Sequence, residues 1–183
     1  MSLEPKFDDY NPSELQDWRE RQDKALQTEG RKLGTNIERH MKHFIIDQLK
    51  ALFGENWDIE IGSIQRDCES RAKEQMEKNY KEGLGRQEIP WTDQFYIKDY
   101  KTIIEKYWAK KPDEVPNAGS FEHHFSIDVG HGFSTKSDKV KWISLFNTLR
   151  NNWAHEGTKE KGLNKSDVEL LAKIHDGLGL QRT

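Results

Sequence analysis

The sequence predicts an all-α fold, a helical bundle of about five helices preceded by an N-terminal helical arm. Apolar residues recur at three- and four-residue spacing along much of the 183-residue chain, as on the buried face of an amphipathic helix. Several of these stretches begin at a capping residue or end at a glycine. Alternating patterns typical of strands are short and weak, so helices packed around one core are expected.

The composition predicts a small core with a highly charged surface. A third of the residues are charged, and the mean hydropathy is −1.00, but 19 aromatic residues (Trp 6, Phe 8, Tyr 5) supply large groups to bury. The net charge is −3 with both signs interspersed, so a contact with nucleic acid is expected only through a local basic patch. The one cysteine, Cys68, excludes an internal disulfide and a zinc site built from cysteines.

Targeting signals are not recognisable. The chain holds no apolar run of 18 residues, and its start, MSLEPKFDDY, lacks the apolar region of a signal peptide. A cytoplasmic protein without membrane contact is therefore expected. The polar segment after MSL is also compatible with a piece of a longer protein, whose other domains would be partners.

The first half of the chain predicts three helices. A mostly charged helix over residues 14–29 has Ser13 as its N-cap and belongs to the arm, residues 1–34. A second, amphipathic helix is expected over residues 36–53, before Gly54. A third is expected over residues 63–82. Its apolar row is thin and comprises Ile64, Cys68, Ala72, Met76 and Tyr80.

The second half predicts three more helices in the main domain, residues 35–183. A helix over residues 96–110 carries a broad apolar face and is followed by a long irregular loop over residues 112–135. Phe121, Phe125 and Phe133 are expected to pin this loop. A further helix is expected over residues 136–155. The last begins after Asn164, which has Asp167 three residues on, and ends near Gly177.

The stretch NTLRNNWAHEG, residues 147–157, carries the candidate site. On a helical wheel the apolar residues before and within it share one sector about 100° wide. These are Trp142, Leu145, Phe146, Leu149 and Trp153. The polar residues Arg150, Asn151 and His155 fall in the opposite half, with Asn151 and His155 four residues apart and therefore within contact distance on a helix.

This trio suits metal-independent cleavage of RNA. A histidine near pKa 6.5 takes and gives protons at neutral pH, and an amide beside it fixes its tautomer. A guanidinium fork binds phosphate and stabilises the anionic phosphorus centre of the transition state. A purely structural interpretation is the alternative, because a histidine in a last helical turn interacts favourably with the helix dipole. Arg150 would then pair with Glu156 or Glu160.

The segment LRNNWAH, Leu149 to His155, resembles the Arg-x4–6-His signature of HEPN domains, in which a polar residue such as Asn151 follows the arginine. LKALFGENW, DYKTIIEKYW, the Phe-rich loop, WISLFNTLRNNWAH and LNKSDVELL are similar to the HEPN variety at the C-terminus of large prokaryotic defence and ATPase proteins. The resemblance covers roughly residues 35–178 and leaves out the first 34.

The resemblance implies an all-α homodimer in which two copies of the motif form a ribonuclease cleft without metal or cofactor. Arg150 would bind the scissile phosphate, His155 would act as general acid or base, and Asn151 would orient one of them. Products with a 2′,3′-cyclic phosphate and a 5′-hydroxyl follow. Three lysines would add to RNA binding, namely Lys159, Lys161 and Lys165.

Two other functions stay open from the sequence. Many HEPN domains are dimerisation or docking modules of larger regulatory or defence proteins, which is the main alternative to a ribonuclease. A more distant one is a metal-dependent hydrolase, because FEHHFSIDVGHGF holds four residues of types that bind zinc. These are His123, His124, Asp128 and His131. Their spacing matches no standard zinc motif, and solvated loop histidines are the simpler expectation.

Overall fold

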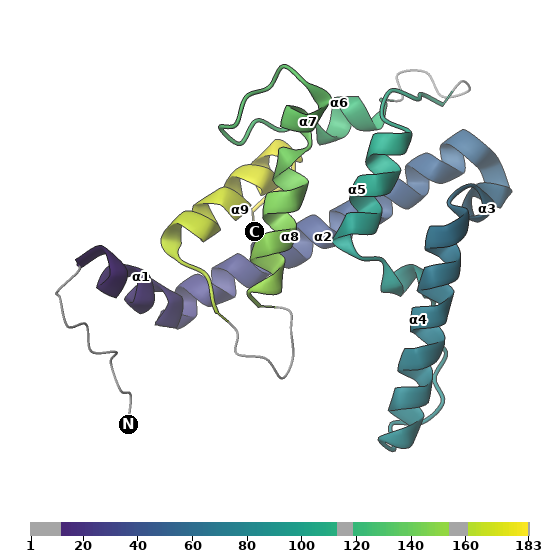
Figure 1. Cartoon of the computed structure of the whole chain (residues 1–183), viewed down its shortest axis with the longest axis horizontal. Coiled ribbons are helices and arrows are strands. Elements are labelled where there is room, and N and C mark those ends of the chain that lie inside the picture. Colours follow the sequence, from purple (N-terminus) through teal and green to yellow (C-terminus); the bar gives the residue numbers. More distant parts are fainter. Residues whose placement is uncertain (1–11, 113–118, 154–160, 183) are drawn as a thin grey trace. The chain divides into compact units, whose positions relative to one another are not determined.

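The computed structural model describes residues 12–112, 119–153 and 161–182, and all regular elements in these ranges are helices (Figure 1). The all-α prediction is therefore confirmed. In chain order the α-helices are α1 (Pro12–Gln22), α2 (Lys24–Phe53), α3 (Trp57–Glu60), α4 (Gly62–Lys81), α5 (Ile97–Lys106), α6 (Phe121–Phe125), α7 (Lys136–Lys139), α8 (Lys141–Asn151) and α9 (Lys165–Gly177). Two 3₁₀-helices, η1 (Gly54–Asn56) and η2 (Trp91–Gln94), lie between them. Within the described ranges, no helix has the length and apolar character needed to cross a bilayer.

The chain divides into two compact units. Unit 1 combines Met1–Ile37 with Leu145–Thr183, and unit 2 is Glu38–Ser144. Helices α2 and α8 each cross from one unit to the other. The described N-terminal residues thus share a unit with the C-terminal helix α9. The expected domain boundary at residue 34, which followed the extent of the family resemblance, stays a prediction.

Unit 1 has a core drawn from α2, α8 and α9. Leu33 and Ile37 of α2, Phe146 of α8, and Leu171 and Ile174 of α9 are at most 5% exposed. The last helix begins as the sequence predicts. Its Asn164 side chain accepts a hydrogen bond from the Asp167 backbone amide, and the Asp167 carboxylate accepts one from the Asn164 backbone amide, which caps the first turn.

Unit 2 joins its helices through aromatic packing and one shielded ion pair. Trp142 is fully buried and donates its indole hydrogen to the Phe125 carbonyl at 2.8 Å, which fixes α8 to α6. The Arg71 guanidinium of α4 donates to Asp99 at 2.9 Å and lies 3.6 Å from the centre of the Tyr96 ring. Cys68 is buried beside them, and burial raises the pKa of its thiol to about 11.

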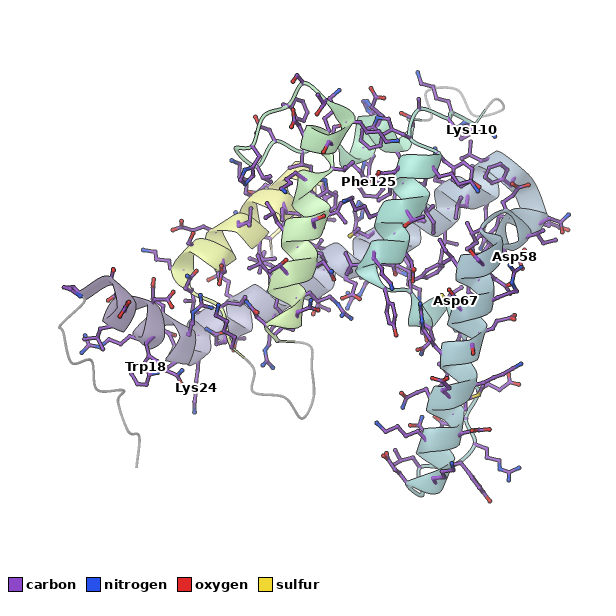
Figure 2. All side chains as sticks on the ribbon, viewed as in Figure 1. Trp18, Lys24, Asp58, Asp67, Lys110 and Phe125 are labelled. Atoms are coloured by element: carbon purple, nitrogen blue, oxygen red, sulfur yellow. The ribbon has the colours of Figure 1, made fainter. Side chains whose placement is uncertain are left out.

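The second half of α4 is held by surface contacts. None of residues 73–90, all within the described ranges, is buried, and Tyr80 is 54% exposed. The chain turns back alongside α4 in Figure 1, and Figure 2 shows the α4 side chains, Asp67 among them, radiating from the helix. Of the apolar row predicted for this helix, Cys68 and Ala72 are buried, whereas Ile64 and Met76 are partly exposed and Tyr80 is exposed.

Several predicted helix boundaries are wrong. The expected break between residues 29 and 36 is absent, since α2 runs unbroken through that stretch, and the chain breaks at Asp23 instead. The predicted irregular loop contains α6, whose Phe121 and Phe125 are fully buried as expected, whereas Phe133 is 45% exposed. The predicted helix over residues 136–155 is two helices separated at Val140.

Candidate functional site

Arg150 and Asn151 stand at the C-terminal end of α8 in unit 1. The apolar stripe of this helix is buried as predicted at Trp142, Phe146 and Leu149. Burying that stripe places the other half of the helix toward the surface, so Asn151 is exposed and Arg150 is partly exposed. The structure therefore agrees with the predicted separation of the polar motif residues from the core.

The helix that carries the motif is shorter than predicted. Helix α8 ends at Asn151, and the next two residues form tight turns, with the Asn152 amide donating to the Leu149 carbonyl at 2.9 Å and the Trp153 amide donating to the Arg150 carbonyl at 3.1 Å. The predicted contact between Asn151 and His155 rested on α-helical spacing continued beyond Asn151, and it stays a prediction. His155 and Lys159 themselves lie outside the described residues.

The end of α8 is seated on a glycine of α2. A methyl group added at Gly34 would lie 2.4 Å from the Trp153 Cζ2 atom, so the indole ring rests directly on the α2 backbone. One helical turn earlier, a methyl group at Gly30 would lie 2.4 Å from Cδ1 of Leu163. The two glycines therefore form one face of α2 that receives the residues on both sides of the stretch 154–162.

The two remaining lysines of the predicted site are exposed and lie beyond that stretch. The Gly162 amide donates to the Asn152 carbonyl at 3.3 Å, which joins the chain before α9 to the end of α8. Lys161 precedes Gly162, and Lys165 is the first residue of α9. The structure thus brings the backbone at Lys161 close to the turn that follows Arg150.

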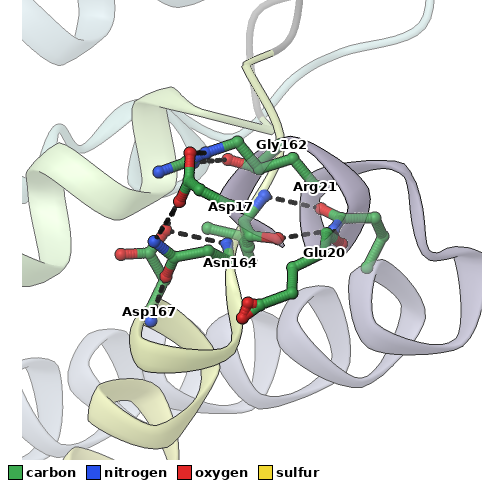
Figure 3. Close-up of polar contacts among 8 residues, drawn as sticks. Asp17, Glu20, Arg21, Gly162, Asn164 and Asp167 are labelled. Carbon is green, nitrogen blue, oxygen red and sulfur yellow. Dashed lines mark hydrogen bonds and ion pairs between the residues drawn. The ribbon is translucent and has the colours of Figure 1, made fainter. Parts of the chain in front are cut away.

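Acidic residues of α1 and α9 adjoin this basic region (Figure 3). Arg21 donates to the Asp17 carboxylate at 2.8 Å and lies 3.4 Å from that of Asp167. The hydrogen bond from Arg21, together with a second from Asn164, holds the pKa of the Asp17 carboxyl below its usual range, and the charge of Lys161 adds to the effect. Asp17 therefore remains ionised at neutral pH and partly offsets the positive charge of Lys161.

The histidines of the Phe-rich stretch, all within the described ranges, do not converge as the metal-dependent alternative would require. His124 of α6 stacks on Phe44 with 3.8 Å between ring centres, and its Nε2 lies 2.7 Å from Nε2 of His40. Burial, together with the nearby His40 and His123, lowers the pKa of His124 to about 4. Among the described residues, no three histidine, cysteine or carboxylate side chains converge as metal ligands.

Sequence reasoning missed Arg21, Gln27 and the glycine pair of α2. Gly30 and Gly34 are four residues apart, a spacing that permits close approach to a helix, but both fell within the break expected between residues 29 and 36. Arg21 and Gln27 contact residues more than 130 positions away in the sequence, and no local pattern reveals such partners.

The chain matches no family model, no curated protein and no solved structure.

Proposed function

We propose that the chain is a HEPN-type module that binds RNA and cleaves it without a metal ion, acting as a homodimer. The proposal is carried by the motif LRNNWAH and by the place of its first polar residues. Arg150 and Asn151 stand at the end of α8, away from the buried stripe, where a ligand has access. The bond between Gly162 and Asn152 adds Lys161 to the same neighbourhood.

In the proposed reaction the ribose 2′-oxygen attacks the adjacent phosphorus, and the bond from phosphorus to the 5′-oxygen breaks. The 2′-hydroxyl loses its proton to a base, and an acid protonates the leaving 5′-oxygen. His155 moves one of these protons, and its copy in the second chain of the dimer moves the other. Arg150 stabilises the charge on the phosphoryl oxygens. The products carry a 2′,3′-cyclic phosphate and a 5′-hydroxyl.

A cleavage assay on mixed single-stranded and transfer RNA tests this function, with EDTA present throughout. The wild type is expected to cleave and to leave cyclic phosphate ends, whereas His155→Ala and Arg150→Ala each lose about 100-fold or more in rate. His43→Ala is a matched control, because His43 is an exposed histidine of unit 2, and it should cleave like the wild type.

Two results would contradict the proposal. Cleavage that EDTA abolishes would replace it with a metal-dependent reaction. A wild type that dimerises in sedimentation experiments but does not cleave RNA, even at high protein concentration, would favour the docking module instead. In that case substitution of Arg150 would weaken the assembly.

A further inference from the structure

The side-chain amide of Gln27 holds the chain before α9 through two hydrogen bonds. The Gln27 Nε2 donates to the Leu163 carbonyl at 2.7 Å, and its Oε1 accepts from the Leu163 amide at 2.7 Å. These two hydrogen bonds resemble the paired bonds between neighbouring β-strands, so the chain at Leu163 has little freedom to shift along α2. Leu163 is fully buried and its side chain meets Gly30, so both its backbone and its side chain are fixed by α2.

Arg21 grips the preceding residue. Its Nη1 donates to the Gly162 carbonyl at 2.8 Å while its Nε donates to Asp17, and its side chain is only 14% exposed. Hydrogen bonds from a charged donor in such a shielded place are stronger than those between neutral groups. Without the guanidinium, the carboxylates of Asp17 and Asp167 would both lose the positive charge that lies beside them.

The backbone at Gly162 is itself in contact with α1. Its φ of +76° lies in the region that favours glycine, and an added methyl group would lie 2.9 Å from the Arg21 carbonyl oxygen. The Gly162 amide at the same time bonds to Asn152, directly after α8. The hydrogen bonds that hold Gly162 and Leu163 therefore also restrain the end of α8.

Polar contacts contribute to the attachment of α1. None of the residues of α1, all of which the structure describes, is buried. Helix α1 is thus held through Arg21, through Asp17 and through the Asn164 amide, which donates to Asp17 at 2.7 Å. Helix α1 therefore adds little to the hydrophobic core. The hydrogen bonds of Arg21 and Asp17 call for a role other than core packing.

We propose that Arg21 and Gln27 are positioning residues that set the spacing between Arg150 and Lys161, and with it the register of two neighbouring RNA phosphates. Phosphate contacts fix the register of a nucleic acid on a protein, and small misplacements of reacting groups cost large factors in rate. This inference rests on the proposed ribonuclease function. Neither side chain is assigned a contact with RNA or a role in proton transfer.

Steady-state cleavage by variants of the full chain is the first test. Arg21→Ala and Gln27→Ala are expected to lose about tenfold or more in kcat/KM with folding retained, as checked by circular dichroism. Arg21→Lys keeps the charge but not the fork, and should fall between Arg21→Ala and the wild type. Arg19→Ala is the matched control, since it removes an exposed arginine of the same helix, and should leave cleavage unchanged.

The pH dependence of Gln27→Glu separates positioning from a general loss of folding. An ionised carboxylate repels the Leu163 carbonyl, whereas a protonated carboxyl donates to it as the amide does. The rate of Gln27→Glu relative to the wild type should therefore rise about threefold or more between pH 7.5 and pH 5, because a neighbouring carbonyl raises the pKa of a carboxyl. Gln27→Ala, which has no group to protonate, should show a constant ratio.

Amide hydrogen exchange at Leu163 follows the same contact without RNA, and is expected to accelerate in Gln27→Ala and Arg21→Ala but not in Arg19→Ala. Faster exchange together with wild-type kcat/KM would overturn the positioning role and leave the ribonuclease function standing. The same conclusion follows from a relative rate of Gln27→Glu that does not change with pH. A wild type that fails to cleave RNA would overturn the function and, with it, the positioning of phosphates.

Discussion

At the scale of single residues, the most unusual pair in unit 2 is that of His40 and His124. Two ring nitrogens 2.7 Å apart share a hydrogen bond only if one of them carries a proton and the other does not. The accepting imidazole is therefore neutral, and the ring of Phe44 covers one face of His124. This arrangement ties the short helix α6 to α2 and makes the tie sensitive to acid.

The folded protein is expected to lose stability as the pH falls from about 6.5 toward 4. The pKa of His124 is lowered to about 4 in the folded protein, so as the pH falls the unfolded chain binds a proton at this residue first. The stability that neutral His124 contributes is therefore complete above the ordinary histidine pKa and is lost below it. Urea unfolding at pH 7.5 and pH 4.5 measures the effect, which should be on the order of 2 kcal/mol.

The variant His124→Phe keeps an aromatic ring to stack on Phe44 but cannot titrate, so its unfolding free energy should change less between the two pH values. Part of the change should remain, because burial also lowers the pKa of His175 in unit 1, with the same sign. An equal change in His124→Phe and in the wild type would refute the assignment. His43→Ala, at an exposed position, should behave like the wild type.

At the scale of elements, α2 is the helix that the sequence predicted least well. Local patterns predicted α9 correctly, because Asn164, Asp167 and the apolar residues that follow lie within a few positions of one another. The same patterns placed a break near Gly30 and Gly34, since glycine usually disfavours a helix interior. At these two glycines α2 is in contact with Leu163 and Trp153, and no rule of local spacing contains such distant partners.

The variant Gly34→Ala is expected to destabilise the protein although alanine is the better helix former by about 1 kcal/mol. The added methyl group would overlap the Trp153 ring at 2.4 Å, and forcing a packed ring aside typically costs about 1–3 kcal/mol. Thermal unfolding compares it with Thr35→Ala, an exposed position one residue along α2 that should be neutral or slightly stabilising. A higher unfolding temperature for Gly34→Ala would show that Trp153 is not seated on α2.

At the scale of the whole molecule, the fold class was predictable from the sequence, but the candidate site was only partly so. Apolar spacing alone placed Arg150 and Asn151 away from the core, since that result depends on one helix. The end of α8 at Asn151 was not foreseen, because it coincides with the docking of Trp153 on a glycine more than a hundred residues earlier. The acidic neighbours of Lys161 were missed for the same reason.

The dependence of RNA affinity on salt should reveal how many chains bind one RNA. In the proposed function each chain would offer four basic side chains to the RNA backbone, at Arg150, Lys159, Lys161 and Lys165. For single-stranded RNA the slope of log affinity against log salt is then about −3 for one chain and about −6 for a dimer. Binding titrations between about 50 and about 300 mM salt measure this slope. Lys78→Ala, in unit 2, should leave the slope unchanged, and a slope near zero would exclude binding through these phosphate contacts.

The buried thiol of Cys68 makes the natural chain a ready background for site-specific labelling. It is the single cysteine of the sequence, it is enclosed between α4 and its neighbours, and its raised pKa leaves almost no thiolate at neutral pH. A second cysteine introduced at an exposed position, such as Lys161, would therefore take a maleimide spin label or fluorophore alone. Distances between two such labels would report the approach of two chains directly, with no native residue replaced to remove background reactivity.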